Sequence, residues 1–314
     1  MDVLLWGRFG AGERETWHAA LARAWPAGRW LDLAEARSHP AAVRAAVVAN
    51  PPPGSLQGFG QLGLIQSLWA GVDRLLADAT LPPHVPLARM VDPAMNAAMA
   101  ETALWAVLGL HRGYFRYERL QREQRWSPHP QRRADELVVA VLGTGQMGRA
   151  VLQQLQPLGY RLRGWSAHAA TGLPAGVLAS HGEAALDALL AEADIIINLL
   201  PLTPRTEGLF DAARLARLRP QAALVNLARG AHVVEADLLA ALDTGRLHHA
   251  VLDVFRTEPL PPGHPFWAHP RVTVLPHAAA QTDPRSAAQV VAANLEALAS
   301  GAPLAHLVDR ARGY

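Results

Sequence analysis

Short apolar runs alternate with stretches of helical spacing through the first 93 residues. Segments such as 13–25 repeat their apolar residues at intervals of three and four, as an amphipathic helix does. Strands separated by helices predict a parallel sheet that is covered on both faces. The predicted strands of this part are 3–6, 45–49, 62–68 and 85–90.

A second series of apolar runs begins at residue 137, with alanine-rich helical segments between the runs. This alternation predicts a second and larger α/β unit. The predicted strands of this unit are 137–143, 161–165, 193–200, 222–228, 249–255 and 272–276.

The segments that join and follow the two series define the domains. Residues 95–126 contain no proline and predict one or two helices packed away from the sheet, whereas the Pro-rich polar stretch 127–136 predicts a loop. Asp283 followed by proline is a helix start, so 284–299 is the last predicted helix, and we expect it to return to the first domain.

The predicted fold class is α/β, with two doubly wound parallel-sheet domains. A larger domain of residues 94–283 is inserted in a smaller, flavodoxin-like domain of residues 1–93 plus 284–314. A length of 314 residues suits two domains.

The composition of the chain limits the classes of binding partner that we expect. No apolar run approaches the roughly 20 residues that span a bilayer, and the first residues do not resemble an export signal, so we expect no membrane partner and a cytoplasmic protein. The net charge is only +2 and the arginines are scattered, which does not favour a nucleic-acid partner.

The chain contains neither cysteine nor lysine. Thiolate nucleophiles, lysine Schiff bases and phosphate loops of the Walker type are therefore excluded. No G-x-S-x-G or H-E-x-x-H motif occurs, and His248, His249, His264 and His269 lack the spacing of metal ligands on a helix, so no metal is predicted.

A glycine pattern follows the first strand of the second unit. Gly143, Gly145 and Gly148 form G-x-G-x-x-G between an apolar strand and a helical pattern. In that context the glycines permit a tight turn, close approach of a pyrophosphate and close helix packing, and the amides of Gln146 and Met147 face the anion. Glycines alone would indicate ordinary turns, but their position favours dinucleotide binding. Residues 94–283 are therefore predicted to form a Rossmann cofactor domain, and the smaller domain to be the substrate domain.

The next strand ends without a carboxylate. An acidic residue about 20 positions after the glycines would bind the ribose 2′-hydroxyl of NAD, but Trp165, Ser166 and His168 occupy this stretch. Ser166, together with His168 or Arg163, could contact a 2′-phosphate instead. The sequence therefore predicts NADP(H) as the preferred cofactor, with NAD(H) possible; a plain surface loop is the alternative.

Three later strand ends carry polar residues suited to reducing a 2-keto acid. Arg229 offers a planar fork for the substrate carboxylate, and His277 is a proton donor for the carbonyl oxygen. Glu258 would orient the imidazole and favour its charged form. Each residue alone has an ordinary surface or capping interpretation, but the three together, downstream of a cofactor loop, predict a catalytic site.

The sequence resembles the D-2-hydroxyacid dehydrogenase family over nearly its whole length, and in particular the glyoxylate/hydroxypyruvate reductase A branch. The segments that carry the resemblance are SLWAGVD (67–73), LGTGQMG (142–148), WS (165–166), INLLPLTPRTEG (197–208), NLARGAHVVEADLLAAL (226–242), LDVFRTEPLPP (252–262), HPRVTVLPHAAA (269–280) and the terminal VDRARGY.

The resemblance implies reduction of glyoxylate or hydroxypyruvate and places Arg229, Glu258 and His277 at the family's catalytic positions. It implies that Trp69, Ala70 and Gly71 meet the substrate carboxylate and that the helices near 95–125 form a homodimer contact. It also implies cofactor contacts from Leu200, Pro201, Thr206, Leu227 and Asp253.

Two positions depart from the branch. Ala167, His168 and Ala169 stand where it has arginine or lysine for the 2′-phosphate, and Ala49-Asn50 stands where it has an aromatic wall. Two alternatives stay open: a dehydrogenase of this family for another keto acid, or a dinucleotide-sensing binding protein. The complete triad argues against the second.

Overall fold

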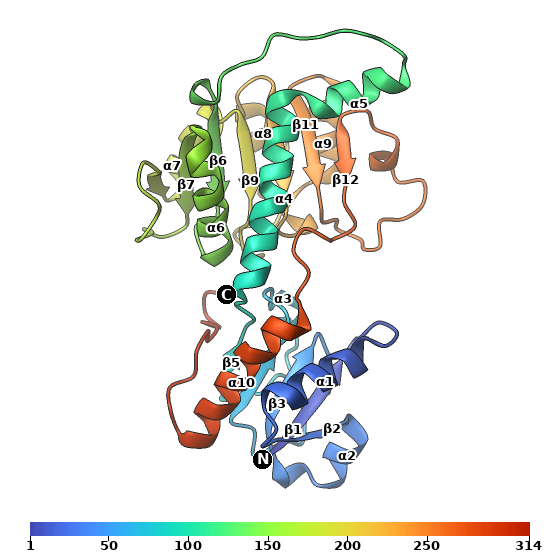
Figure 1. Cartoon of the computed structure of the whole chain (residues 1–314), viewed down its shortest axis with the longest axis vertical. Coiled ribbons are helices and arrows are strands. Elements are labelled where there is room, and N and C mark those ends of the chain that lie inside the picture. Colours follow the sequence, from blue (N-terminus) through green and yellow to red (C-terminus); the bar gives the residue numbers. More distant parts are fainter. The chain divides into compact units, whose positions relative to one another are not determined.

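The computed structural model describes residues 1–314, which form two compact units. One unit contains Met1–Met95 and Thr282–Tyr314, and the other contains Asn96–Gln281. Both are parallel sheets flanked by helices (Figure 1), so the α/β prediction is confirmed. No helix has the length and apolar character needed to cross a membrane.

The smaller unit has a parallel sheet with the strand order β2-β1-β3-β4-β5, the flavodoxin-like order of a doubly wound fold. Its strands are β1 (Asp2–Gly7), β2 (Arg29–Leu31), β3 (Val43–Ala49), β4 (Leu64–Ser67) and β5 (Leu87–Ala88). Its helices are α1 (Glu13–Ala24), α2 (Leu33–Ser38), α3 (Asp73–Leu76) and α10 (Pro284–Ser300), with a short 3₁₀ turn η1 (Pro40–Ala42).

Helix α10 joins the smaller unit although it comes last in the chain. Asp283 caps its amino terminus by accepting the amide of Arg285, and the helix lies beside α1 (Figure 1). The buried amide of Asn294 donates to the side-chain oxygen of Gln66 in β4 at 2.7 Å and accepts the amide of Ala305 at 2.8 Å. Buried amides must be paired, so these bonds fix the position of α10 on the sheet.

The larger unit has a seven-stranded parallel sheet with the order β12-β11-β10-β9-β6-β7-β8. The order reverses beside β6, which is the switch point where ligands bind in such sheets. Its strands are β6 (Val138–Leu142), β7 (Arg161–Ser166), β8 (Leu178–His181), β9 (Ile195–Asn198), β10 (Ala222–Asn226), β11 (Leu247–Leu252) and β12 (Val272–Val274).

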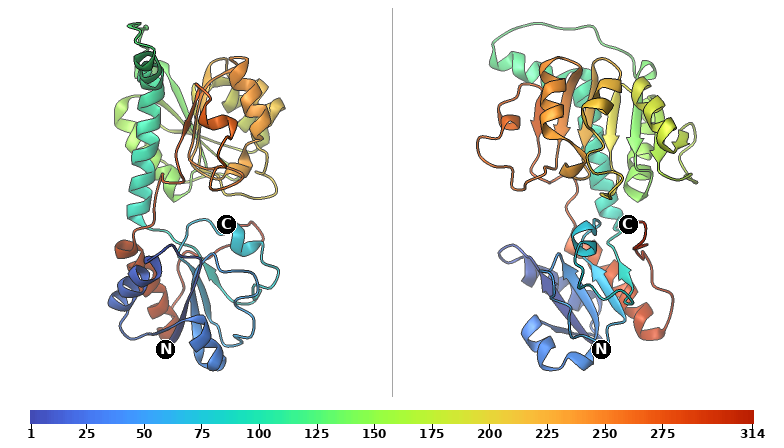
Figure 2. Two further views of the ribbon diagram at one scale, coloured as in Figure 1. Left: turned by 90° about the vertical axis from the view of Figure 1, so that its right-hand side faces the viewer. Right: turned by 180° about the vertical axis from the view of Figure 1, so that it is seen from behind.

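Helices cover both faces of this sheet, as Figure 2 shows. Apolar residues of α7, α8 and α9 form one core with the strands, and those of α4 and α6 form a second core on the other face. The helices are α4 (Pro93–Arg112), α5 (Tyr114–Arg122), α6 (Gln146–Leu155), α7 (Glu183–Glu192), α8 (Ala212–Arg217) and α9 (Glu235–Asp243). The 3₁₀ turns are η2 (Ala134–Glu136), η3 (Gln156–Leu158), η4 (Gly230–His232) and η5 (Pro265–Trp267).

The segment predicted as one or two helices forms two. Gly113 separates α4 from α5 with a left-handed φ of 72°. Glycine adopts this φ without strain, and a Cβ there would also lie 2.5 Å from the ring of His129. Past this break, Phe115 stacks on His249 at 4.9 Å between ring centroids. Burial, and then the charge of His248, lowers the pKa of His249 to about 3, so its ring is a neutral packing element.

Three edge strands differ from the sequence expectation. Strands β2 and β8 were not predicted, because the first has three residues and the second, LASH, is mostly exposed and carries no apolar run. Strand β5 is shorter than the predicted run 85–90. Pro86 has no amide to give to a strand ladder and only accepts the amide of Ile65 through its carbonyl, at 2.9 Å.

Candidate active site

The glycine loop lies between the end of β6 and the start of α6. Gly143 adopts a φ of 99°, and a Cβ on it would lie 2.7 Å from the carbonyl oxygen of Leu199. A Cβ on Gly148 would lie 1.9 Å from the carbonyl oxygen of Gly143. Gly145, in contrast, faces open space at its Cβ position. Two glycines thus close the turn, and the third leaves room for a ligand at the amino terminus of α6.

Hydrogen bonds connect this loop to the end of β7. The amide of Gly143 donates to the carbonyl oxygen of Trp165 at 2.8 Å, and the hydroxyl of Thr144 donates to that of Ser166 at 3.0 Å. The Ser166 hydroxyl then donates to the carbonyl oxygen of His168 at 2.7 Å. His168 is exposed and Ser166 is half-buried, so both remain candidates for contact with the ribose.

Two neighbouring residues have structural partners. The Trp165 indole is buried and donates to the carbonyl oxygen of Gly182, so its side chain belongs to the core. Arg163 is paired with Glu192 at 2.9 Å. We therefore expect Trp165 to act through its backbone, and we assign no cofactor contact to Arg163.

The site's histidine and glutamate are in direct contact. Nδ1 of His277 lies 2.8 Å from Oε2 of Glu258, and the other carboxylate oxygen accepts the amide of Phe255 at 2.9 Å. Because a carboxylate accepts hydrogen bonds, Nδ1 carries the proton and Nε2 is left on the exposed edge of the ring. His277 has a left-handed φ of 54°, an unusual conformation for a residue other than glycine.

The carboxyl of Glu258 is held in its charged form. Burial alone would raise its pKa, but the hydrogen bonds from His277 and from the Phe255 amide, together with the charges of His277 and Arg229, lower the pKa below its ordinary value. Arg229 follows β10 and donates to the carbonyl oxygen of Ala228 at 2.7 Å. Its influence on Glu258 brings all three predicted catalytic residues into one electrostatic group.

Asp253 fixes the backbone that carries His277. Its buried carboxylate accepts the amides of Ala278 at 2.7 Å and Ala279 at 3.1 Å, and its carbonyl oxygen accepts the amide of His277 at 2.9 Å. The hydroxyl of Thr102 in α4 donates to the carbonyl oxygen of Ala279 at 2.8 Å. These bonds over-determine the loop and hold the left-handed histidine in place.

A buried polar network that the sequence analysis missed supports the neighbouring loops. The amide nitrogen of Asn198 donates to the side-chain oxygen of Asn226 at 3.0 Å and to Nδ1 of His232 at 2.9 Å. Asn226 in turn donates to the carbonyl oxygen of Arg229 at 2.9 Å. Because Nδ1 of His232 accepts, its Nε2 is the donor toward the carbonyl oxygen of Pro201 at 3.3 Å. An asparagine at the end of an otherwise apolar strand was the available signal.

The remaining cofactor candidates lie at the same edge of the sheet. Leu200 and Leu227 are buried, and their backbones follow β9 and β10. Thr206 donates its hydroxyl to the carbonyl oxygen of Pro201 at 2.7 Å, which closes the loop after β9. These residues can shape an apolar floor beside Gly143, whose turn packs on the carbonyl oxygen of Leu199.

The predicted substrate loop of the smaller unit follows β4. The Ser67 hydroxyl lies 3.0 Å from the amide of Trp69 and holds it, and the Trp69 ring meets Trp17 edge-on at 6.1 Å. The amides of Ala70 and Gly71 donate to no acceptor within the protein. Free amides in a rigid loop are suited to an anion such as a carboxylate.

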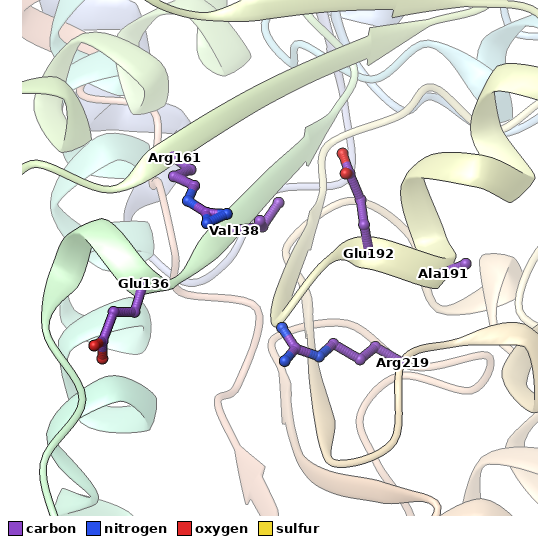
Figure 3. A pocket seen from close by; sticks show the side chains of 6 residues that line it. All are labelled: Glu136, Val138, Arg161, Ala191, Glu192 and Arg219. Carbon is purple, nitrogen blue, oxygen red and sulfur yellow. The ribbon is translucent and has the colours of Figure 1, made fainter.

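A cavity of about 310 Å³ lies elsewhere, at the opposite end of the larger sheet (Figure 3). Val138 begins β6 and Arg161 begins β7, so this hollow is remote from the glycine loop and the histidine, which follow the carboxyl ends of the strands. It is lined by Glu136, Val138, Arg161, Ala191, Glu192 and Arg219. We assign it no role in the chemistry. No group of three or more histidine, aspartate or glutamate side chains could hold a metal ion.

Replacing Glu258 with glutamine is expected to lower kcat about 10- to 100-fold, because the partner that orients His277 loses its charge. The lowered pKa of Glu258 keeps the carboxylate ionised at neutral pH, and its contribution is lost only as the pH falls through that lowered pKa. In the parent protein the rate of reduction should therefore fall as the pH drops through the lowered pKa of Glu258, and the glutamine variant should lack this acid limb.

The pH–rate profile of kcat/KM measures this difference between the two proteins. Glu235→Gln is the matched control, because Glu235 pairs with His264 at 3.5 Å in the same unit. A Glu258→Gln profile that coincides with the parent profile would contradict the proposed role of Glu258.

Comparison with known proteins connects this site to a family. Residues 104–279 match the model of the D-isomer specific 2-hydroxyacid dehydrogenase NAD binding domain. The chain is 41% identical over 305 residues to a glyoxylate/hydroxypyruvate reductase A of Serratia proteamaculans, which covers 96% of both chains. It is 40% identical over 307 residues to one of Klebsiella pneumoniae, covering 96% of this chain and 97% of the relative.

Solved structures agree over the whole chain. A D-isomer specific 2-hydroxyacid dehydrogenase of Xanthobacter autotrophicus, in complex with NADPH and MES, has a TM-score of 0.93 and 40% identity and covers 100% of this chain and 99% of its own. An NADPH-dependent glyoxylate/hydroxypyruvate reductase of Sinorhizobium meliloti, in complex with NADP and sulfate, has a TM-score of 0.91 and 35% identity with the same coverage.

Proposed function

Because the chain belongs to the D-isomer specific 2-hydroxyacid dehydrogenase family, we propose that it reduces glyoxylate and hydroxypyruvate to their 2-hydroxy acids, with NADP(H) as the preferred cofactor and NAD(H) as a possible one. The observation that carries the proposal is the bond of 2.8 Å between His277 and Glu258, with Arg229 close enough to lower the pKa of that glutamate. The reductases named above, at about 40% identity, support the choice of substrates.

The larger unit fits a dinucleotide. Gly145 leaves open space at the amino terminus of α6, where backbone amides suit a pyrophosphate. The end of β7 carries no carboxylate that would repel a 2′-phosphate. The NADPH- and NADP-bound relatives support the same preference.

The cofactor and the protein supply different parts of the reaction. NADPH, when bound, supplies the hydride that reaches the carbonyl carbon of the keto acid. Arg229 binds the substrate carboxylate with its planar fork and polarises the adjacent ketone. His277 donates the proton on Nε2 to the carbonyl oxygen, which completes the alcohol. Glu258 stabilises the positive imidazole before that transfer, and in the oxidation direction His277 takes the proton back.

The loop after β4 contributes to substrate binding in this proposal. The amides of Ala70 and Gly71 have no acceptor within the protein and can donate to the substrate carboxylate. Trp69 is held by Ser67 and Trp17 and is suited to shape a small pocket. These features favour keto acids with short side chains.

Initial rates with glyoxylate, hydroxypyruvate, pyruvate and phenylpyruvate, each with NADPH and with NADH, test the proposal. We expect the largest kcat/KM for glyoxylate or hydroxypyruvate with NADPH. Faster turnover of phenylpyruvate would point to a pocket opened at Asn50, whose side-chain oxygen is buried and has no hydrogen-bond partner. Dinucleotide binding without turnover of any acid would favour a binding protein.

We also propose a homodimer through α4 and α5, as the family resemblance implies. Trp105 of α4 is 44% exposed although it packs edge-on against Phe115, and Tyr114 at the start of α5 is 58% exposed. Exposed aromatic residues on neighbouring helices are typical of a protein interface. Light scattering should give a mass of two chains, and Trp105→Glu should shift it toward one.

A further inference from the structure

We propose that Arg149 binds the 2′-phosphate of NADP(H) and so supplies the positive charge that the loop after β7 lacks. The inference rests on the proposed NADP(H) preference. Ala167, His168 and Ala169 follow Ser166, and none of them carries a permanent positive charge. A phosphomonoester carries nearly two negative charges at neutral pH, so selective binding in this loop calls for a cation from another element.

Arg149 lies on the first turn of α6 and extends toward that loop. Its Nε donates to the carbonyl oxygen of Thr144 at 3.2 Å, and the Thr144 hydroxyl donates to Ser166 at 3.0 Å. One of its terminal nitrogens lies 3.7 Å from the position that a Cβ on Gly172 would take. The guanidinium therefore stands between the glycine loop and the segment 166–172, where the ribose of a bound dinucleotide is expected.

The guanidinium is available for an anion. Arg149 is half-buried, and its only hydrogen bond within the protein uses Nε, so the terminal nitrogens keep their donors and no carboxylate neutralises the charge. The two arginines of β7 do not serve this loop. Arg163 is paired with Glu192 at 2.9 Å, and Arg161 donates to the carbonyl oxygen of Asp135 at the other end of β7.

The hydroxyls of Thr144 and Ser166 are engaged in hydrogen bonds within the protein. The Ser166 hydroxyl accepts from Thr144 and donates its proton to the carbonyl oxygen of His168, so its donor is already in use. A fixed Ser166 keeps the loop in one conformation, while the planar fork of Arg149 can bind two phosphate oxygens at once. The charge of Arg149 on α6 and the fixed conformation of the loop after β7 would together discriminate NADP from NAD.

Isothermal titration of the full-length protein with NADP⁺ and with NAD⁺ tests this role without any turnover. Arg149→Gln should raise the Kd for NADP⁺ about 10- to 100-fold, the range expected for loss of a hydrogen bond to a charged group. Its Kd for NAD⁺ should change less than about 3-fold. Adenosine 2′,5′-bisphosphate and 5′-AMP serve as probes of the same difference, because they differ only in the 2′-phosphate.

Two further variants are compared with Arg149→Gln in the same titrations. Arg163→Gln is the matched control and should leave both Kd values unchanged, since that arginine is paired with Glu192. Arg149→Lys keeps the charge without the fork and should recover part of the NADP⁺ affinity. Melting temperatures of all variants close to that of the parent would exclude misfolding as the cause.

The outcomes separate this inference from the proposed function. A parent protein that binds NADP⁺ more tightly than NAD⁺, with an Arg149→Gln variant that keeps this ratio, would overturn the role of Arg149 and leave the NADP(H) preference standing. Equal weakening of both cofactors would make Arg149 a structural residue and also overturn it. A parent protein without preference for NADP⁺ would contradict the proposed cofactor itself, and the inference with it.

Discussion

Replacing His277 with alanine is expected to lower kcat for hydroxypyruvate about 100- to 10,000-fold, the usual contribution of a general acid. The Kd for NADP⁺ should change less than about 3-fold, because the ring lies 2.8 Å from Glu258 and after β12, away from the glycine loop. Stopped-flow measurement of NADPH oxidation gives the chemical step, and titration gives the Kd.

A matched control shows whether the loss of activity is specific to the proposed general acid or follows from removing any histidine that is paired with a carboxylate. His269 lies 3.2 Å from Asp243 in the same unit but at the opposite end of the sheet, before β12, so His269→Ala should retain nearly full activity. A His277→Ala variant with near-parental kcat would remove this residue from its proposed role. Weaker NADP⁺ binding in proportion to the lost rate would indicate a distorted site instead.

Replacing Arg229 with alanine is expected to lower kcat/KM about 30- to 5,000-fold, the range for removing one partner of a close charge pair. Most of the loss should appear as a higher KM, because the guanidinium binds the carboxylate in the ground state as well as in the transition state. Steady-state kinetics with glyoxylate and hydroxypyruvate measure both parameters.

Lysine at position 229 tests whether the planar geometry of the guanidinium or only its positive charge is needed. Arg229→Lys restores the positive charge but cannot bind a carboxylate with two parallel hydrogen bonds, so its kcat/KM should fall between those of the parent and the alanine variant. Full recovery by lysine would show that charge alone suffices. An unchanged KM in Arg229→Ala would contradict the assignment of this residue to the substrate carboxylate.

The apolar runs were sufficient to predict the α/β fold because parallel strands are buried on both faces and are therefore continuously hydrophobic. Strand β6 has five buried residues and β10 has five, and both lie inside predicted runs. Edge strands carry no such signal: β8 is mostly exposed, and Pro86 shortens β5. Their pairing depends on neighbouring strands rather than on their own sequence.

The residue types at the strand ends were sufficient to propose Arg229, Glu258 and His277 as catalytic residues. They did not reveal which hydrogen bonds hold these residues in place. Asp253 was assigned to the cofactor, yet both of its carboxylate oxygens accept backbone amides beside His277. That arrangement depends on where two loops meet, which no local pattern records. The same holds for the bonds of Asn198, since its partners lie 28 and 34 residues away.

Arg149 illustrates a different limit. As one of 29 basic residues, all of them arginine, it carried no distinguishing feature in the sequence. Its significance comes from the direction of its side chain on α6 and from the absence of a carboxylate partner. Both depend on the packing of the segment that contains Gly172, which the sequence did not predict.

We propose that this chain transfers a hydride from NADPH to the carbonyl carbon of a small 2-keto acid and yields the D-hydroxy acid. Reduction of hydroxypyruvate with NADPH deuterated on the transferred position of the nicotinamide C4 tests it directly, with mass spectrometry and chiral chromatography of the product. We predict D-glycerate with one deuterium on C2 for each NADPH oxidised. Glycerate without deuterium on C2, or the L-isomer, would contradict this proposal.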